Sequence, residues 1–295
     1  SGGGMLGFEK VSAQRQYPNP NPTPQNGPDT VTESIETSYS TDWSRHQAGM
    51  PKLTLKKING VTVKRTKTTY ATNILAKSHS IDSTRNTSWG SFDAGYRYNV
   101  YPSATTTNTY EPTTAALITS ETVESTIKEY GNLTYTKHTV SGGGATYYTT
   151  TNNTYDREDA ANWYLGKLTS TTVTKSGIDR QELPVESTTR ISTWDYDPVT
   201  GAVTAERTLN GTSLAATALV EVLHKTETSY KGVSYSDFGL RNAVSSVSGS
   251  GVGSDKTDRT ARTFYDAKGR FPELTVDALG FETKATYDYV KGVKT

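Results

Sequence analysis

Residues 265–288 read YDAKGRFPELTVDALGFETKATYD, and this stretch decides the fold class. Its three aspartates, Asp266, Asp277 and Asp288, are spaced by eleven residues, twice. Aspartate at the first position and glycine at the fourth, as in Asp266 to Gly269 and Asp277 to Gly280, is the composition of a type I turn. About seven residues separate successive turns, a strand of roughly 23 Å at about 3.3 Å per residue. The spacing predicts an extended antiparallel meander that grows by adding strand–turn units.

Two registers are open for the last hairpin of this stretch. A two-residue loop pairs Asp277 with Gly280 and sets Glu273 opposite Lys284. A three-residue loop pairs Asp277 with Phe281 and gives Gly280 a positive φ, which glycine adopts without steric cost. Separation of polar from apolar faces favours the first register, and turn chemistry favours the second. We predict the three-residue loop.

Turn signals recur through the rest of the chain. The motif YDPVTG, which ends at Gly201, is a longer version of the same turn, and looser versions occur at 130–132 and 235–239. Asn-Gly supplies the two positive φ values of a type I′ hairpin. This dipeptide predicts hairpins at Asn59-Gly60 and at Asn210-Gly211. We expect the glycine-rich stretches 142–144 and 248–254 to be flexible connections.

Two segments depart from the strand–turn pattern. Residues 1–30 are rich in glycine and proline, which predicts a flexible N-terminal segment with an extended linker or loop. Residues 31–295 are then the β-sheet scaffold. Within it, DREDAANWYL at 156–165 begins with a good N-cap and is followed by a glycine, so we predict one short helix there.

Composition fits a sheet with a thin core. The chain has 51 threonines and 19 tyrosines, which favour strands, and a net charge of only +1. That charge and the 10% of aromatic residues exclude disorder for most of the chain. The near-zero net charge also argues against nucleic acid as the main partner, because binding to the nucleic-acid backbone needs clustered cations. Apolar stretches are too short to span a membrane, and the absence of cysteine excludes disulfides and thiolate metal sites.

In its repeated strand–turn motifs the sequence resembles the YD-repeat, or Rhs, family. The family hallmark is a Tyr-Asp pair, two residues, Gly-Arg, a strand, Asp-x-x-Gly and another strand, and 265–288 matches it almost completely. The motif at 196–201 is similar to a family variant. Residues 156–175 and 7–11 are similar to the branch of insecticidal toxin complexes and Salmonella virulence-plasmid toxins.

This resemblance implies a curled open sheet, or part of a hollow β-shell, that encloses or displays a toxin. Its partners are then a cargo toxin domain or neighbouring shell segments, and its location is secreted or at the bacterial cell surface. The family's self-cleaving core motif is absent, so we expect a fragment that does not close a shell alone. The residues that carry the fold are structural turn residues: Asp266, Gly269, Asp277, Gly280 and Gly201.

No catalytic or cofactor site is legible. The four histidines, His46, His79, His138 and His224, have no partner at metal-ligand spacing. The stretch GSGVGSDKT at 249–257 lacks the glycine before lysine that a phosphate loop needs. The carboxylates Asp156, Glu158 and Asp159 fit a helix N-terminus better than a calcium site. We therefore expect no enzyme activity, no cofactor and no metal.

An alternative function is a surface adhesin that binds carbohydrate or a partner protein. The chain's aromatic residues could stack on sugars, the tryptophans being Trp43, Trp89, Trp163 and Trp194. Aromatic residues on strands are more often packing pairs across a ladder. A glycan array separates the two functions, because a structural shell gives no dose-dependent signal.

Overall fold

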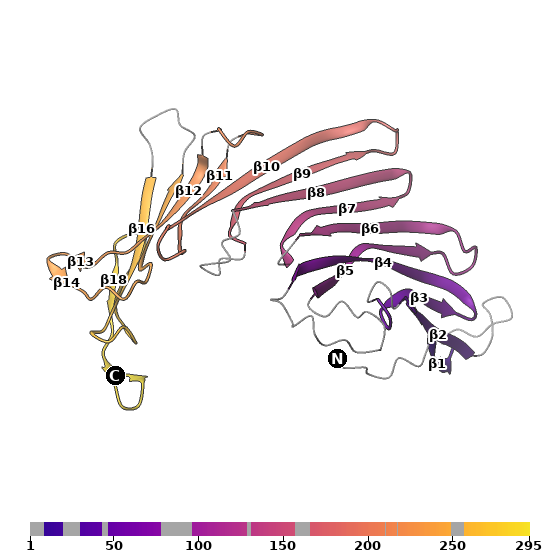
Figure 1. Cartoon of the computed structure of the whole chain (residues 1–295), viewed down its shortest axis with the longest axis horizontal. Helices are drawn as coiled ribbons and strands as arrows, with labels where there is room; N and C mark the ends of the chain where they lie inside the picture. The colour runs from indigo at the N-terminus through magenta and orange to yellow at the C-terminus, as the bar shows by residue number, and fades with distance from the viewer. Residues whose placement is uncertain are drawn as a thin grey trace, which may run out of the picture. The chain divides into compact units, whose positions relative to one another are not determined.

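The computed structural model describes residues 9–19, 30–42, 47–77, 96–128, 131–156, 166–209, 211–216, 218–248 and 257–295. Within these ranges the regular structure is all β-strand, without an α-helix. Sixteen strands form one open antiparallel sheet in the order β1 to β12, β15, β16, β17, β18 (Figure 1). The predicted all-β meander is therefore confirmed. Two further hairpins, β13–β14 and β19–β20, pair separately.

Neighbouring strands of the sheet follow one another in sequence order, without crossovers. The strands of the chain are β1 (Lys10–Pro18), β2 (Thr30–Tyr39), β3 (Pro51–Ile58), β4 (Val61–Lys77), β5 (Tyr96–Tyr110), β6 (Leu117–Ile127), β7 (Leu133–Gly142), β8 (Ala145–Tyr155), β9 (Leu168–Ile178), β10 (Pro184–Tyr196), β11 (Val203–Leu209), β12 (Ala218–Lys225), β13 (Ser229–Tyr230), β14 (Val233–Ser234), β15 (Ala243–Ser248), β16 (Thr257–Tyr265), β17 (Pro272–Val276), β18 (Glu282–Lys284), β19 (Tyr287–Asp288) and β20 (Val293–Lys294).

The chain divides into two compact units, which we describe separately. Unit 1 comprises residues 1–153 and 173–188, and unit 2 comprises residues 154–172 and 189–295. Strands β9 and β10 each contribute residues to both units.

Unit 1 has almost no hydrophobic core among its described residues. Its buried hydrophobic side chains are Tyr101 and Ala145. Cross-strand threonine pairs, each worth about 0.2–1 kcal/mol, hold neighbouring strands together on both faces. Their hydroxyl oxygens lie close across the ladder in the pairs Thr37–Thr54 (3.3 Å), Thr66–Thr107 (3.2 Å) and Thr106–Thr122 (3.1 Å). The abundant threonine is therefore a cross-strand stabiliser here.

Ion pairs across β1, β2 and β3 also stabilise unit 1. The buried carboxylate of Glu33 on β2 binds Lys56 Nζ of β3 at 2.6 Å and the Arg15 guanidinium of β1. Hydrogen bonds from Lys56 and then Arg15 hold the pKa of Glu33 below its usual value. The same arrangement recurs at Glu36, which lies between Lys10 (2.7 Å) and Lys57 (2.8 Å) and has its pKa lowered to about 2 by their hydrogen bonds.

The N-terminal strand begins inside the segment that we expected to be a linker. Strand β1 pairs with β2 from Lys10↔Ser38 to Pro18↔Thr30. This is possible because the closely spaced prolines begin only at Pro18, so the preceding residues keep their ladder donors. Most of the short helix predicted at 156–165 lies outside the described residues, as do Glu158 and Asp159.

The hairpin predictions met different outcomes. Asn59 and Gly60 have φ values of 48° and 81° and join β3 to β4, which confirms the two-residue turn. The expectation of a flexible connection at 142–144 was wrong, because Gly142 pairs with Ala145 and two residues with positive φ form a tight turn. Near Gly211 a hairpin does form, but Leu209 pairs with Ala218, so its loop is longer than two residues. The stretch 249–254 lies outside the described residues.

Unit 2 contains the hydrophobic cluster of the described chain. Phe264, Leu274 and Val276 are its buried members, and Tyr230 and Tyr235 pack against it. The two tyrosines come from residues 226–242, which connect β12 to β15 and which we call the connecting segment. The Tyr235 ring stacks on Phe264 at 4.2 Å between centroids. The connecting segment therefore gives the sheet of unit 2 a second layer of packing.

Candidate functional site

The turn between β16 and β17 is organised by a buried carboxylate. The Asp266 residue is only 2% exposed, and its carboxylate accepts hydrogen bonds from the amides of Arg270 (2.5 Å) and Phe271 (3.0 Å). The Gly269 amide donates to the Asp266 carbonyl at 2.8 Å. Burial opposes ionisation of this carboxyl, but the amides of Phe271 and Arg270 and the Arg270 guanidinium outweigh it, so its pKa lies below the usual value. The ionised Asp266 carboxylate therefore stabilises the backbone of this turn.

Gly269 is required at this turn for two reasons. Its φ of 68° lies in the left-handed region that side chains disfavour. A Cβ at this position would also lie 2.8 Å from the ring of Phe238, which belongs to the connecting segment. The glycine therefore lets the connecting segment pack directly on the turn.

The turn between β17 and β18 has the predicted three-residue loop. The Asp277 amide donates to the Phe281 carbonyl at 3.0 Å, and Leu274 pairs with Lys284. Gly280 has a φ of 89°. The register therefore follows turn chemistry, as predicted.

The turn at Gly201 joins β10 to β11 by a four-residue loop. The Asp197 carboxylate accepts the amides of Val199 (2.9 Å) and Thr200 (2.8 Å), and Gly201 has a φ of 72°. The Arg241 guanidinium of the connecting segment donates to Asp197 Oδ2 at 2.9 Å. The Thr200 amide, then Arg241 and the Val199 amide, hold the pKa of Asp197 far below its usual value.

The structure brings two of the predicted turns to one end of unit 2. Because consecutive turns of a meander alternate between its ends, the turns at Gly201 and Gly269 share one end and the turn at Gly280 lies at the other. The connecting segment contacts both turns at the shared end, through Arg241 and Phe238. The predicted turn residues thus lie in three separate turns, where they stabilise the local backbone.

Two further turns of the same design were missed in the sequence. Residues 111–116 form a four-residue loop in which Glu111 replaces the aspartate and Ala115, with a φ of 57°, replaces the glycine. Residues 179–183 form a three-residue loop with Glu182 at a φ of 61°. The likeness of EPTTAA at 111–116 to DPVTGA at 197–202 is the signal that would have revealed the first.

The histidines and tryptophans considered as ligand or sugar-binding residues lie apart from one another along the sheet, where the structure describes them. His138 lies 2.7 Å from Glu121, and His224 lies 2.9 Å from Glu206, each across neighbouring strands. Trp194 Nε1 donates to Glu206 at 3.3 Å. The candidates outside the described residues are His46, His79, Trp43, Trp89 and Trp163. The part of the chain that the structure describes contains no group of three or more potential ligands for a metal ion.

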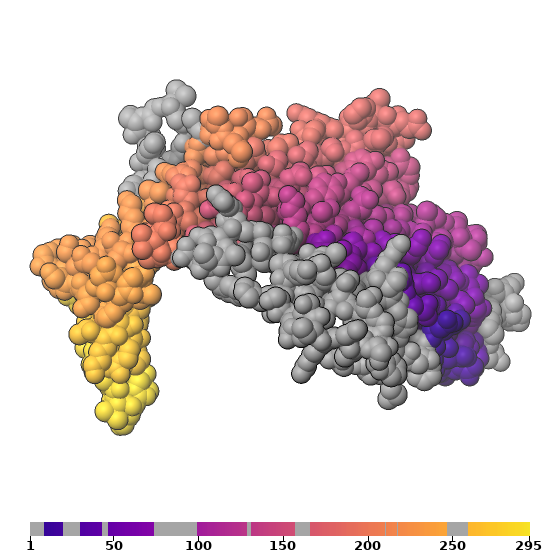
Figure 2. Space-filling model, viewed as in Figure 1, coloured from indigo at the N-terminus to yellow at the C-terminus, as the bar shows by residue number. Residues whose placement is uncertain are grey.

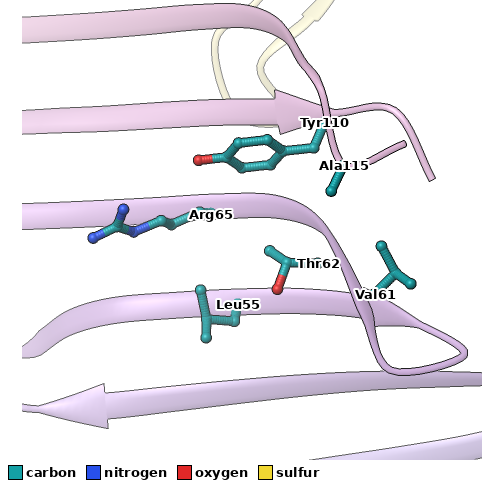
Figure 3. Close-up of a pocket in the computed structure, with 6 residues that line it drawn as sticks. All are labelled: Leu55, Val61, Thr62, Arg65, Tyr110 and Ala115. Atoms are coloured by element: carbon teal, nitrogen blue, oxygen red, sulfur yellow. The ribbon is translucent and has the colours of Figure 1, made fainter. Parts of the chain in front are cut away.

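One surface pocket lies in unit 1, beside the turns of two hairpins. It has a volume of about 440 Å³ and is lined by Leu55, Val61, Thr62, Arg65, Tyr110 and Ala115 (Figure 3). Leu55, Arg65 and Tyr110 come from the neighbouring strands β3, β4 and β5. Its lining is mainly apolar and carries a single charged group, the Arg65 guanidinium.

Comparisons with known proteins return only a weak structural likeness. No protein-family model matches the sequence, and no curated protein matches it. Among solved structures the chain is similar to "Crystal Structure of TcdB2-TccC3", with 11% identity, a TM-score of 0.20, and coverage of 96% of this chain and 20% of that chain. It is also similar to "Crystal Structure of TcdB2-TccC3-TEV", with 12% identity, a TM-score of 0.21, and coverage of 94% and 20%. The chain spans about one fifth of the length of these chains.

No helix among the described residues has the length and hydropathy that a membrane span requires.

Proposed function

We propose that this chain is a non-catalytic structural segment that encloses or displays another polypeptide, such as a toxin domain. The observation that carries the proposal is the sheet of unit 1, which forms a single layer within the described residues. Val123 and Glu124 are consecutive residues of β6, so their side chains point to opposite faces, and both are exposed. A sheet ordinarily buries at least one face against a second layer.

Unit 1 reaches its folded arrangement without such a layer among its described residues. Threonine pairs, and the ion pairs that Glu33 and Glu36 form with lysines of β3, join each strand to its neighbours within the sheet. Strands β6 to β8, coloured magenta, are visible at the surface in Figure 2, and most residues of β6 are exposed. A broad surface of mixed polar and apolar side chains is suited to lining a cavity or binding a second polypeptide chain.

Photo-cross-linking from each face tests this function. A benzophenone amino acid is introduced at Val123 or at Glu124, in the protein as its host produces it. We expect cross-links to another polypeptide segment from one position and few from its neighbour, because a scaffold covers its cargo with one face. The absence of polypeptide cross-links from both positions contradicts the proposal.

The alternative is a surface adhesin for carbohydrate or a partner protein. Its supporting observation is the exposure of aromatic side chains, of which Tyr147 is 51% exposed. A dose-dependent signal on a glycan array, without polypeptide cross-links, favours this alternative. Both functions place the protein secreted or at the bacterial cell surface, a proposal that fractionation of the producing cells tests.

A further inference from the structure

Strands β3 and β4 carry an excess of positive charge that the chain's net charge of +1 conceals. Residues 51–67 contain six cations and no carboxylate. Lys56 and Lys57 bind Glu33 and Glu36. The remaining four cations form no ion pair within the described part of the chain: Lys52, Lys64, Arg65 and Lys67.

The strand register assigns these cations to faces. Leu55 lies opposite Arg65, and Leu53 lies opposite Lys67, so these four side chains share one face, which we call the Arg65 face. Lys64 lies opposite Lys56 and therefore points to the other face. The pocket beside Tyr110 opens on the Arg65 face (Figure 3).

No carboxylate of the neighbouring strands is available to Arg65. On β2, the residue opposite Leu55 is Glu36, which already binds Lys10 and Lys57. On β5, residues 99–110 contain no charged side chain at all. The guanidinium therefore lies at the edge of an apolar pocket and pairs with no carboxylate among the residues that the structure describes.

We propose that this pocket takes an apolar side chain of a polypeptide whose nearby carboxylates pair with Arg65 and Lys67. This inference rests on the proposed function and names the chemistry of the polypeptide that the scaffold holds. The pocket's volume of about 440 Å³ lies within the range of ligand sites, about 300–1,000 Å³, and leaves room for a large side chain.

The spacing of the cations defines the recognised pattern. Along an extended chain, residues two apart lie about 6.6 Å apart on the same side. Arg65 and Lys67 have this spacing on β4, and the pocket lies toward the β3–β4 turn from them. The matching ligand is an extended segment with an apolar residue followed by carboxylates two and four residues later. Aliphatic walls at Leu55 and Val61 favour such a peptide over a nucleic acid or a sulfated glycan.

Fluorescence anisotropy with labelled peptides tests the proposal. The probe is Phe-Ser-Glu-Ser-Glu, and its controls are Ala-Ser-Glu-Ser-Glu and Phe-Ser-Lys-Ser-Lys. The matched protein variants are Arg65→Gln and Lys64→Gln, which remove one positive charge from neighbouring residues on opposite faces. We expect Arg65→Gln to weaken binding of the probe by about three- to fivefold and Lys64→Gln to leave it unchanged. Both control peptides should bind more weakly than the probe.

Three results overturn the proposal. They are an equal loss in both protein variants, equal binding of the lysine peptide, and displacement of the probe by single-stranded DNA or heparin at matched charge concentration. Circular dichroism of each variant verifies that the sheet is intact. If photo-cross-linking from β6 succeeds while the peptide ignores Arg65→Gln, this inference fails and the proposed function stands. If the peptide binds as expected and no cross-link forms, the peptide site at Arg65 stands, but the proposed function fails, and with it the identification of this peptide as the held polypeptide.

Discussion

Replacing Phe264 by alanine removes the side chain at the centre of the cluster in unit 2. Phe264 is 0% exposed and packs on Leu274 and Val276 from β17. Truncation of a buried phenylalanine to alanine lowers the free energy of unfolding by about 3–5 kcal/mol. Stacking with Tyr235 at 4.2 Å contributes about 0.5–1.5 kcal/mol beyond buried area. We therefore expect Phe264→Ala to lower the free energy of unfolding of unit 2 by about 4 kcal/mol.

The matched control is Phe281→Ala, the same substitution at a ring that is 70% exposed. Its expected effect lies within about 0.5 kcal/mol. Urea denaturation followed by circular dichroism gives the stabilities, and hydrogen exchange shows whether the loss is confined to unit 2. Faster exchange in residues 226–242 should accompany the loss, because the connecting segment packs on Phe264. A difference of less than 1 kcal/mol between the variants refutes this account of the cluster.

Three other predictions concern the turns and are checked by denaturant midpoints. Gly280→Ala should lower the free energy of unfolding by about 1–2 kcal/mol through its positive φ alone, because its Cβ would meet no atom within 4 Å. Gly269→Ala should lower it further, because the Phe238 ring blocks its Cβ, and equal losses contradict this. Glu182→Gly should stabilise the chain by about 0.5–1 kcal/mol by relieving a φ of 61°, and a loss of stability opposes it. Hydrogen bonds from the Thr113 hydroxyl and the Thr114 amide lower the pKa of Glu111 from 4.5 to about 2, so its stabilisation is present above pH 4.5 and is lost as the pH falls toward 2. The stability advantage of the native chain over Glu111→Gln should vanish across that window, and a constant advantage argues against the turn's dependence on charge.

Turn chemistry made much of the fold predictable. Asp277 and Gly280 gave the correct register because a type I turn needs a following residue with positive φ, a requirement local to the loop. Asn59 and Gly60 were decisive because they adopt the two positive φ values of a type I′ turn, which is also a requirement local to the loop. Where a residue outside the usual set occupies the same conformation, as Glu182 does, the local signal disappears although the turn remains.

The contacts of the connecting segment could not be predicted in this way. Phe238 packs on Gly269, and Arg241 reaches Asp197, across separations of 31 and 44 residues along the chain. Such contacts depend on how the connecting segment folds back onto the turns at its end of the sheet, and sequence spacing does not encode this. The pocket beside Tyr110 could not be predicted either, because Leu55, Arg65 and Tyr110 meet only through the pairing of three strands.

The accessibility of the two faces of β6 tests the central claim most directly. The chain has no cysteine, so Val123→Cys and Glu124→Cys each introduce a single thiol. In the isolated chain, both thiols should react rapidly with a maleimide, because Val123 and Glu124 point to opposite faces and both are exposed. In the protein as its host produces it, one of the two should be protected by the polypeptide that the sheet covers. Protection of either thiol in the isolated chain, or equal reactivity of both in the host-produced protein, contradicts the claim that this sheet is a scaffold with one covered face.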